Sequence, residues 1–77
     1  MDWPVPVEFI DFFDTLKEGY NETFFYYDIT GVSYDSITAF LNTQFYSMIP
    51  CDCCNANLLI SEVSDTTLLL TMFCYKY

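Results

Sequence analysis

The sequence contains no histidine and no arginine, and it has only two lysines and two glycines in 77 residues. Without histidine, the chain lacks the side chain that most often transfers protons in enzymes. Without arginine, it lacks the planar clamp that commonly holds an oxyanion or a phosphate. Gly19 and Gly31 are too few and too far apart for a glycine-rich phosphate loop, and there is no serine-nucleophile motif. We therefore expect a protein that is not an enzyme, with no catalytic residue and no cofactor.

Positive charge is scarce, whereas negative charge is abundant. Eleven carboxylates stand against Lys17 and Lys76, so the formal net charge is −9. Such an excess destabilises the compact state by self-repulsion, and its field attracts positively charged partners. Direct binding of DNA or RNA is disfavoured, because two lysines cannot neutralise a row of phosphates. Anionic lipid headgroups would also repel the chain. We expect a basic, nucleic-acid-binding protein as the partner, and neither nucleic acid nor a membrane.

Long apolar segments are missing as well. The longest apolar stretch, residues 68–75, is far shorter than the roughly 20 residues of a membrane-spanning helix. The first residues, Met-Asp-Trp-Pro, show neither the basic region nor the apolar region of a secretory signal. The sequence therefore predicts a cytoplasmic protein, located in the host cytoplasm if the protein is viral.

Four cysteines form a C-x-C-C cluster, Cys51, Cys53 and Cys54, and one distant residue, Cys74. Zinc sites usually separate the members of a ligand pair by about two to four residues, and adjacent cysteines point in different directions. The pattern fits zinc poorly, so we expect no metal and interpret the cysteines as reduced thiols. A four-thiolate site and a disulfide from Cys51 or Cys53 to Cys74 stay open as alternatives.

Hydrophobic residues make up 53% of the chain and aromatic residues 21%. Acidic chains that stay disordered are poor in aromatic and β-branched residues, so this composition favours a folded chain. We expect residues 1–77 to form a single acidic α+β domain.

The first predicted element is a helix over residues 7–18. Helical spacing gathers Phe9, Phe12 and Leu16 on one side of this segment. The acidic residues on the other side are Glu8, Asp11, Asp14 and Glu18. Gly19 follows at the position where glycine commonly ends a helix.

The rest of the chain predicts a strand, a second helix and a hairpin. Residues 22–29 are aromatic and β-branched, which favours a strand. Rings on both faces imply burial on both sides, or burial on one side and a partner on the other. Residues 34–48 show helical spacing, and residues 57–63 and 67–77 form a hairpin pattern. We expect two helices packed on one face of a three-stranded, mainly antiparallel sheet, with the pairing of the first strand open.

Eight of the eleven acidic residues lie in the first 35 positions. On the predicted helix, acidic side chains three or four residues apart share one face and destabilise it by a few tenths of a kcal/mol per pair. Such a breach of local rules is typical of a functional surface, although a plain solvated face is the competing interpretation. The residues that we expect to bind a partner are Asp2, Trp3, Glu8, Asp11, Asp14, Glu18, Glu22, Asp28 and Asp35.

A row of carboxylates on a rigid element resembles the phosphate row of a nucleic acid in charge and approximate repeat. The leading hypothesis is a small, virus-encoded DNA mimic that inhibits a host CRISPR complex, restriction system, nuclease or repair enzyme. One alternative is an immunity protein or antitoxin for a nuclease toxin. Another is an assembly subunit that uses its aromatic surface to bind itself or a scaffold. The oligomeric state and the partner's identity stay open.

Overall fold

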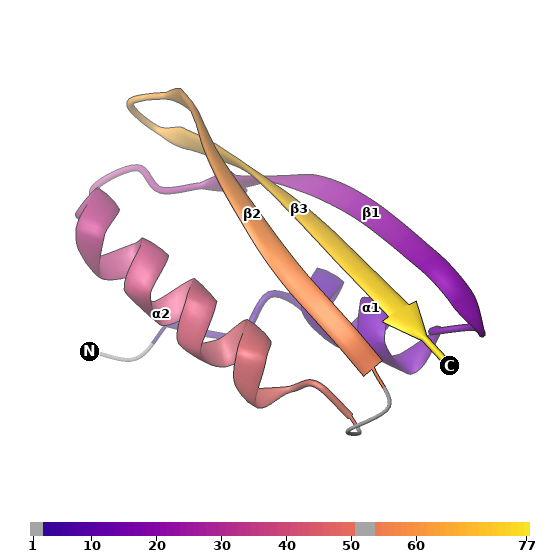
Figure 1. The fold of residues 1–77 in the computed structure, drawn as a ribbon. Coiled ribbons are helices and arrows are strands. Elements are labelled where there is room, and N and C mark those ends of the chain that lie inside the picture. The colour runs from indigo at the N-terminus through magenta and orange to yellow at the C-terminus, as the bar shows by residue number, and fades with distance from the viewer. Residues whose placement is uncertain (1–2, 51–53) are drawn as a thin grey trace.

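The computed structural model describes residues 3–50 and 54–77, which form two helices and a three-stranded antiparallel sheet (Figure 1). The elements are α1 (Val7–Asp14), β1 (Gly19–Asp28), α2 (Tyr34–Ser47), β2 (Cys54–Ser64) and β3 (Thr67–Lys76). The strand order is β1-β3-β2, so the last strand lies in the centre and pairs antiparallel with both others. The predicted element order and α+β class are confirmed. Neither helix in these ranges is long and apolar enough to cross a membrane.

The core lies between the helices and one face of the sheet. Side chains of a strand alternate between its two faces, and in β3 the residues from Leu68 to Cys74 at every second position are fully buried. Both helices contribute buried side chains to the same cluster, so both cover the same face of the sheet, as the sequence predicts. The buried apolar residues are Phe9, Phe12, Ile29, Ile37, Leu41, Phe45, Cys54, Ala56, Leu68, Leu70, Met72 and Cys74.

Helix α1 is shorter than the predicted segment 7–18, because it ends at Asp14. The N–H of Thr15 donates a hydrogen bond of 3.1 Å to the carbonyl of Asp11. The Thr15 hydroxyl donates a second bond, of 2.7 Å, to the same carbonyl. Thr15 itself has φ of −110° and ψ of 16°, outside the helical range, so the last helical turn ends here.

The segment after α1 is a turn built around Asn21. The Asn21 side-chain amide donates to the carbonyl of Lys17 at 2.7 Å and accepts from the Lys17 N–H at 3.3 Å. Gly19 has a φ of +92°, a region that glycine adopts without strain, and it begins β1 instead of capping the helix. The prediction that Glu18 lies on the acidic face of the first helix is therefore wrong.

The other predicted segments are present with shifted ends. The first strand begins at residue 19 instead of 22, and the second helix ends at residue 47 instead of 48. The second strand begins at Cys54 instead of residue 57, because pairing with β3 continues to the pair of Cys54 and Lys76.

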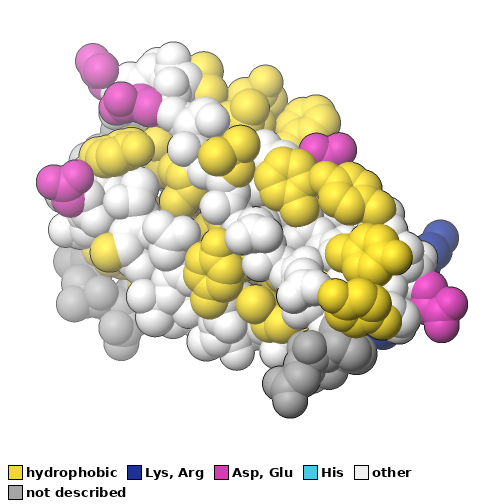
Figure 2. Space-filling view, viewed as in Figure 1, with side chains coloured by type: hydrophobic (Ala, Val, Ile, Leu, Met, Phe, Trp, Pro, Cys, Tyr) yellow, Lys and Arg dark blue, Asp and Glu magenta, His cyan; other side chains and the backbone are white. Residues whose placement is uncertain are grey.

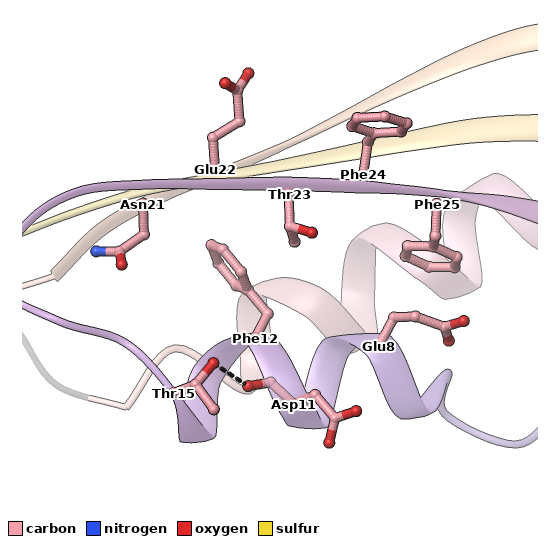
Figure 3. A pocket seen from close by; sticks show the side chains of 9 residues that line it. All are labelled: Glu8, Asp11, Phe12, Thr15, Asn21, Glu22, Thr23, Phe24 and Phe25. Carbon is pink, nitrogen blue, oxygen red and sulfur yellow. Dashed lines mark hydrogen bonds between the residues drawn. The ribbon is translucent and has the colours of Figure 1, made fainter.

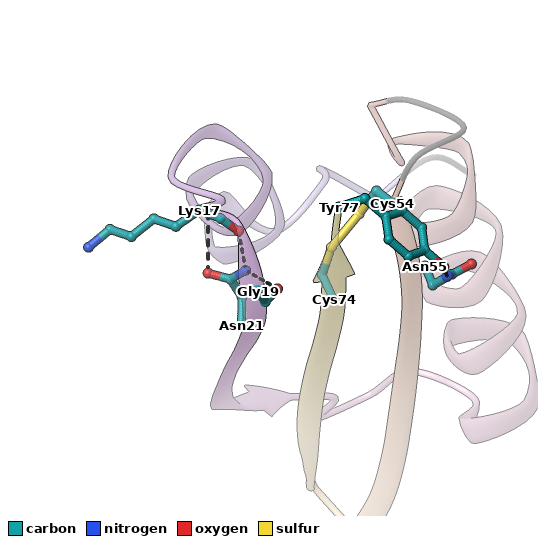
Figure 4. The surroundings of a disulfide bond; sticks show 7 residues. All are labelled: Lys17, Gly19, Asn21, Cys54, Asn55, Cys74 and Tyr77. Carbon is teal, nitrogen blue, oxygen red and sulfur yellow. Dashed lines mark hydrogen bonds between the residues drawn. A yellow bond between two sulfur atoms is a disulfide. The ribbon is translucent and has the colours of Figure 1, made fainter.

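A disulfide joins Cys54 of β2 to Cys74 of β3 (Figure 4). The two Cα atoms are 6.4 Å apart, and Cys74 lies opposite Ala56, so the bonded residues are diagonal neighbours on the buried face. This bond corrects the interpretation of these two residues as reduced thiols. Disulfides persist mainly in oxidising compartments, so the cytoplasmic location stays a prediction. Cys51 and Cys53 lie outside the described residues.

Candidate functional site

The structure places the predicted partner-binding residues on several different surfaces. α1 carries Glu8, Asp11 and Asp14, the following loop carries Glu18, β1 carries Glu22 and Asp28, and α2 begins with Tyr34 and Asp35. Among the described residues, no charged side chain is buried, so each of these carboxylates is accessible to a partner. Asp2 lies outside the described residues.

A pocket of about 330 Å³ lies between α1 and β1, and we call it the α1–β1 groove (Figure 3). It is lined by Glu8, Asp11, Phe12 and Thr15 of the α1 segment and by Asn21, Glu22, Thr23, Phe24 and Phe25 of β1. The rings of Phe12 and Phe25 point into the space between helix and strand, whereas Glu22 and Phe24 point to the other face of the sheet. The groove thus has an aromatic floor with Glu8 beside it, whereas the carboxylate of Glu22 lies on the other face of the strand and that of Asp11 points away from β1.

Glu8 also acts on Tyr27, the next inward-facing residue of β1. Partial burial raises the pKa of the Tyr27 phenol, and the negative charge of Glu8 raises this pKa further. The Tyr27 phenol therefore stays protonated and uncharged at neutral pH. The negative charge on the helix side of β1 is that of Glu8, and α1 contains no basic residue to neutralise it.

β1 is an edge strand, and half of its backbone groups point out of the sheet. The N–H of Ile29 donates to the carbonyl of Thr66 at 2.8 Å, which makes these two residues a hydrogen-bonded pair in the register of β1 and β3. Hydrogen-bonded and non-hydrogen-bonded pairs alternate along antiparallel strands. The alternate residues Glu22, Phe24 and Tyr26 therefore direct their N–H and carbonyl groups to the open edge.

The opposite edge of the sheet, formed by β2, is protected. The N–H of Leu58 donates to the hydroxyl of Tyr46 on α2 at 3.3 Å. A register shift between Glu62 and Ser64 also interrupts regular pairing, and bulges of this kind blunt strand edges. In the described part of the chain, no hydrogen bond from a loop or side chain reaches the outward backbone groups of Phe24 or its edge neighbours. The β1 edge is therefore the open one.

The face of the sheet opposite the helices carries large, exposed aromatic side chains, and we call it the outer face. Tyr20, Phe24 and Tyr26 of β1 are each more than 60% exposed, and Tyr75 of β3 is 49% exposed. Figure 2 shows hydrophobic side chains gathered in a row over the strands, with carboxylates at the margins of the view. Contiguous apolar patches of this kind mark interaction surfaces. The prediction that β1 is buried on both faces is therefore wrong, and burial on one face is confirmed, whereas a partner on the other face stays a prediction.

Trp3 is half-buried, and its ring packs edge-on against Phe40 of α2 with centroids 5.4 Å apart. Much of its surface is therefore used inside the protein. A role for Trp3 as an anchor for a partner stays a prediction.

Asp28 has a local partner at the end of β1. Its carboxylate accepts hydrogen bonds from the hydroxyl of Thr30 at 2.6 Å and from the Thr30 N–H at 2.9 Å. These two bonds lower the pKa of Asp28 below its ordinary value of 3.8. A lowered pKa in the folded state means that this stabilisation is present above the unfolded pKa and is lost as the pH falls through the folded pKa.

Thr30→Ala is expected to raise the pKa of Asp28 towards its ordinary value without restoring it fully, because the backbone N–H bond remains. The measurement is an NMR titration of the Asp28 carboxyl carbon. Thr38→Ala is the control, since the Thr38 hydroxyl donates to the Asp35 carbonyl and not to a carboxylate. An unchanged Asp28 pKa in Thr30→Ala would contradict the assignment.

The chemistry of the groove suits a cation. Carboxylates form strong charge-assisted hydrogen bonds with lysine and arginine, and exposed rings can stack on a guanidinium. Within residues 3–50 and 54–77, no three potential metal ligands lie close enough together to hold a metal ion. The sequence pointed to the acids of the first helix, but it missed the neighbouring strand edge, which only the strand order reveals.

No family model matches the chain, and no curated protein or solved structure matches it either. We therefore infer the function of the chain from its own residues.

Proposed function

We propose that the chain is a small acidic inhibitor that covers the basic, nucleic-acid-binding surface of another protein. The observation that carries this proposal is the α1–β1 groove, where Glu8 and Asp11 lie beside a strand edge that bears Glu22. Lysine and arginine side chains of a partner would pair with these carboxylates, and the rings of Phe24 and Tyr26 would lose contact with water. Occupation of the partner's basic site would exclude DNA or RNA from it.

A surface that serves only to keep the chain dissolved does not explain this combination. Solvated acidic faces need no exposed aromatic rings beside them, and large uncovered rings lower the solubility that the charges provide. A basic protein partner accounts for both features, because it neutralises the carboxylates and buries the rings.

The proposal is tested by immobilising the chain and exposing it to a lysate of the cells in which it naturally acts. The retained protein is expected to bind DNA or RNA by itself, and excess duplex DNA should displace it. High salt should weaken the complex, since exposed ion pairs are screened over about 8 Å at physiological ionic strength. A retained protein that does not bind nucleic acid, or that stays bound in excess DNA, would overturn the proposal.

The outer face supports a second candidate, an assembly subunit that associates through its aromatic side chains. This association would bury Tyr20, Phe24 and Tyr26, but it would also bring Glu22 and Asp28 of two like-charged molecules together. Salt screens this repulsion, so self-association should strengthen as salt rises, opposite to the inhibitor complex. Sedimentation of the purified chain at low and high salt separates the two.

An immunity protein or antitoxin would use the same electrostatics. In that case the retained protein would be a nuclease that is toxic when it is expressed without this chain.

A further inference from the structure

We propose that the open edge of β1 receives an extended basic segment of the partner as a fourth strand, with lysine or arginine side chains over the α1–β1 groove. The inference rests on the proposed function for the basic character of the partner, and it adds the mode of binding.

The backbone of β1 supplies the hydrogen-bonding groups for an added strand. Glu22, Phe24 and Tyr26 present N–H and carbonyl groups outward at every second residue, the spacing that an extended peptide requires. β1 is ten residues long and contains no proline or lysine, the residues that natural proteins commonly use to block an edge. Its register with β3 is continuous from Gly19 to Asp28. The edge is therefore long and regular, and its charged residues, Glu22 and Asp28, repel an acidic strand but not a basic one.

The charges beside the edge select a basic occupant. Alternate side chains of an added strand point to opposite faces of the sheet. Those on the helix side would meet Glu8, and those on the outer face would meet Glu22 and the ring of Phe24. Arginine or lysine finds a carboxylate on either face, and an arginine on the outer face can also stack on the ring.

A second copy of the chain is a poor occupant of the same edge. Pairing of two β1 strands would bring Glu22 and Asp28 of both molecules onto the same face of one continuous sheet. Like charges across a strand pair are destabilising, and each copy carries a net charge of −9. The edge therefore favours a basic strand over its own copy.

The first test uses a short peptide of alternating arginine and valine, with binding measured by calorimetry. Its matched control carries N-methyl groups on alternate backbone nitrogens, which keep every charge but remove the N–H donors of a strand. We expect the unmodified peptide to bind and the methylated peptide to bind at least about tenfold more weakly. On binding, hydrogen exchange at the N–H groups of Glu22, Phe24 and Tyr26 should slow. Equal affinities, or no binding of the unmodified peptide, would overturn the inference.

The second test separates the groove from the overall charge. The groove variant is Glu8→Gln/Asp11→Asn, and the control variant is Glu62→Gln/Asp65→Asn, at the end of β2 and in the hairpin turn. Both variants lose two negative charges through the same pair of substitutions. We expect the groove variant to lose at least about tenfold in peptide affinity and the control variant to lose less than about twofold. Similar losses in both variants would mean that total charge, not the groove, binds the peptide.

Failure of this inference is distinguishable from failure of the proposed function. If the retained partner is displaced by DNA while the peptide does not bind, strand addition is wrong and the inhibitor function stands. If the peptide binds at β1 but the retained partner does not bind nucleic acid, the inhibitor function is wrong and the binding mode stands.

Discussion

Phe45→Ala is expected to lower the free energy of unfolding by about 3–5 kcal/mol, because truncation of a buried phenylalanine removes apolar contact and leaves a cavity. Phe45 of α2 is completely buried. Its ring centroid lies 5.4 Å from that of Phe9 and 5.1 Å from that of Phe13, so this side chain joins α2 to α1. Small proteins have only about 0.05–0.15 kcal/mol of stability per residue, so the loss is a large share of the total.

The measurement is urea unfolding followed by far-ultraviolet circular dichroism. Phe24→Ala is the matched control, because this ring is 63% exposed on the outer face and should change the stability by no more than about 0.5 kcal/mol. An effect of Phe45→Ala below about 1 kcal/mol would contradict the central place of this ring. The comparison also separates folding from binding, since Phe24→Ala is expected to weaken the peptide complex while the protein stays folded.

The element order was predictable because the signals for it are local. Helical spacing of Phe9 and Phe12, and of Ile37, Leu41 and Phe45, matches the sides that the helices bury. Alternation in β3 matches the two faces of the central strand. These patterns can be read from the sequence because apolar residue types mark the positions that become buried.

The end of α1 was not predictable from the same signals. Apolar spacing continues to Leu16, but Thr15 leaves the helical conformation, and hydrogen bonds between Asn21 and Lys17 hold the turn that follows. Polar side chains of these types can bond to nearby backbone in several conformations, so the pattern alone does not decide between them.

The candidate site depends on strand order, which is a long-range property. Residues 19–28 border a groove because β3 pairs between β1 and β2 and leaves β1 at an edge. One local cue was present, because Glu22 and Asp28 interrupt an aromatic strand, and charged residues on a strand are typical of an edge. Because of this strand order, Glu22 lies at the same groove as Glu8 and Asp11. Glu18 lies in the loop after α1 and not on the helix face that the sequence predicted for it.

Part of the acidic excess therefore lies beside one structural feature, the open edge of β1. Net charge alone attracts any cation, and it would do so equally from every surface. At the β1 edge, carboxylates lie beside unpaired backbone groups. An extended basic segment can form both ion pairs and backbone hydrogen bonds there, whereas a scattered basic patch can form only the ion pairs.

Removal of the disulfide is expected to lower the free energy of unfolding by about 3 kcal/mol, because the bond closes a loop across a sequence separation of 20 residues. Both cysteines are buried on the inner face, Cys54 at 6% exposure and Cys74 at 0%. Cys54→Ala/Cys74→Ala removes the bond without placing a polar group in the core.

The measurement compares the urea unfolding of this variant with that of the parent chain, each with and without a thiol-free reductant. The parent chain is expected to lose stability on reduction and to approach the variant, whereas the variant should not respond. Cys51→Ser/Cys53→Ser is the control, because it leaves only Cys54 and Cys74 to pair and prevents exchange of disulfide partners. A parent chain whose stability is unchanged by reduction would show that the bond between β2 and β3 does not stabilise the fold. A loss of about 3 kcal/mol would make the fold, and with it the β1 edge, less stable in a reducing compartment than in an oxidising one.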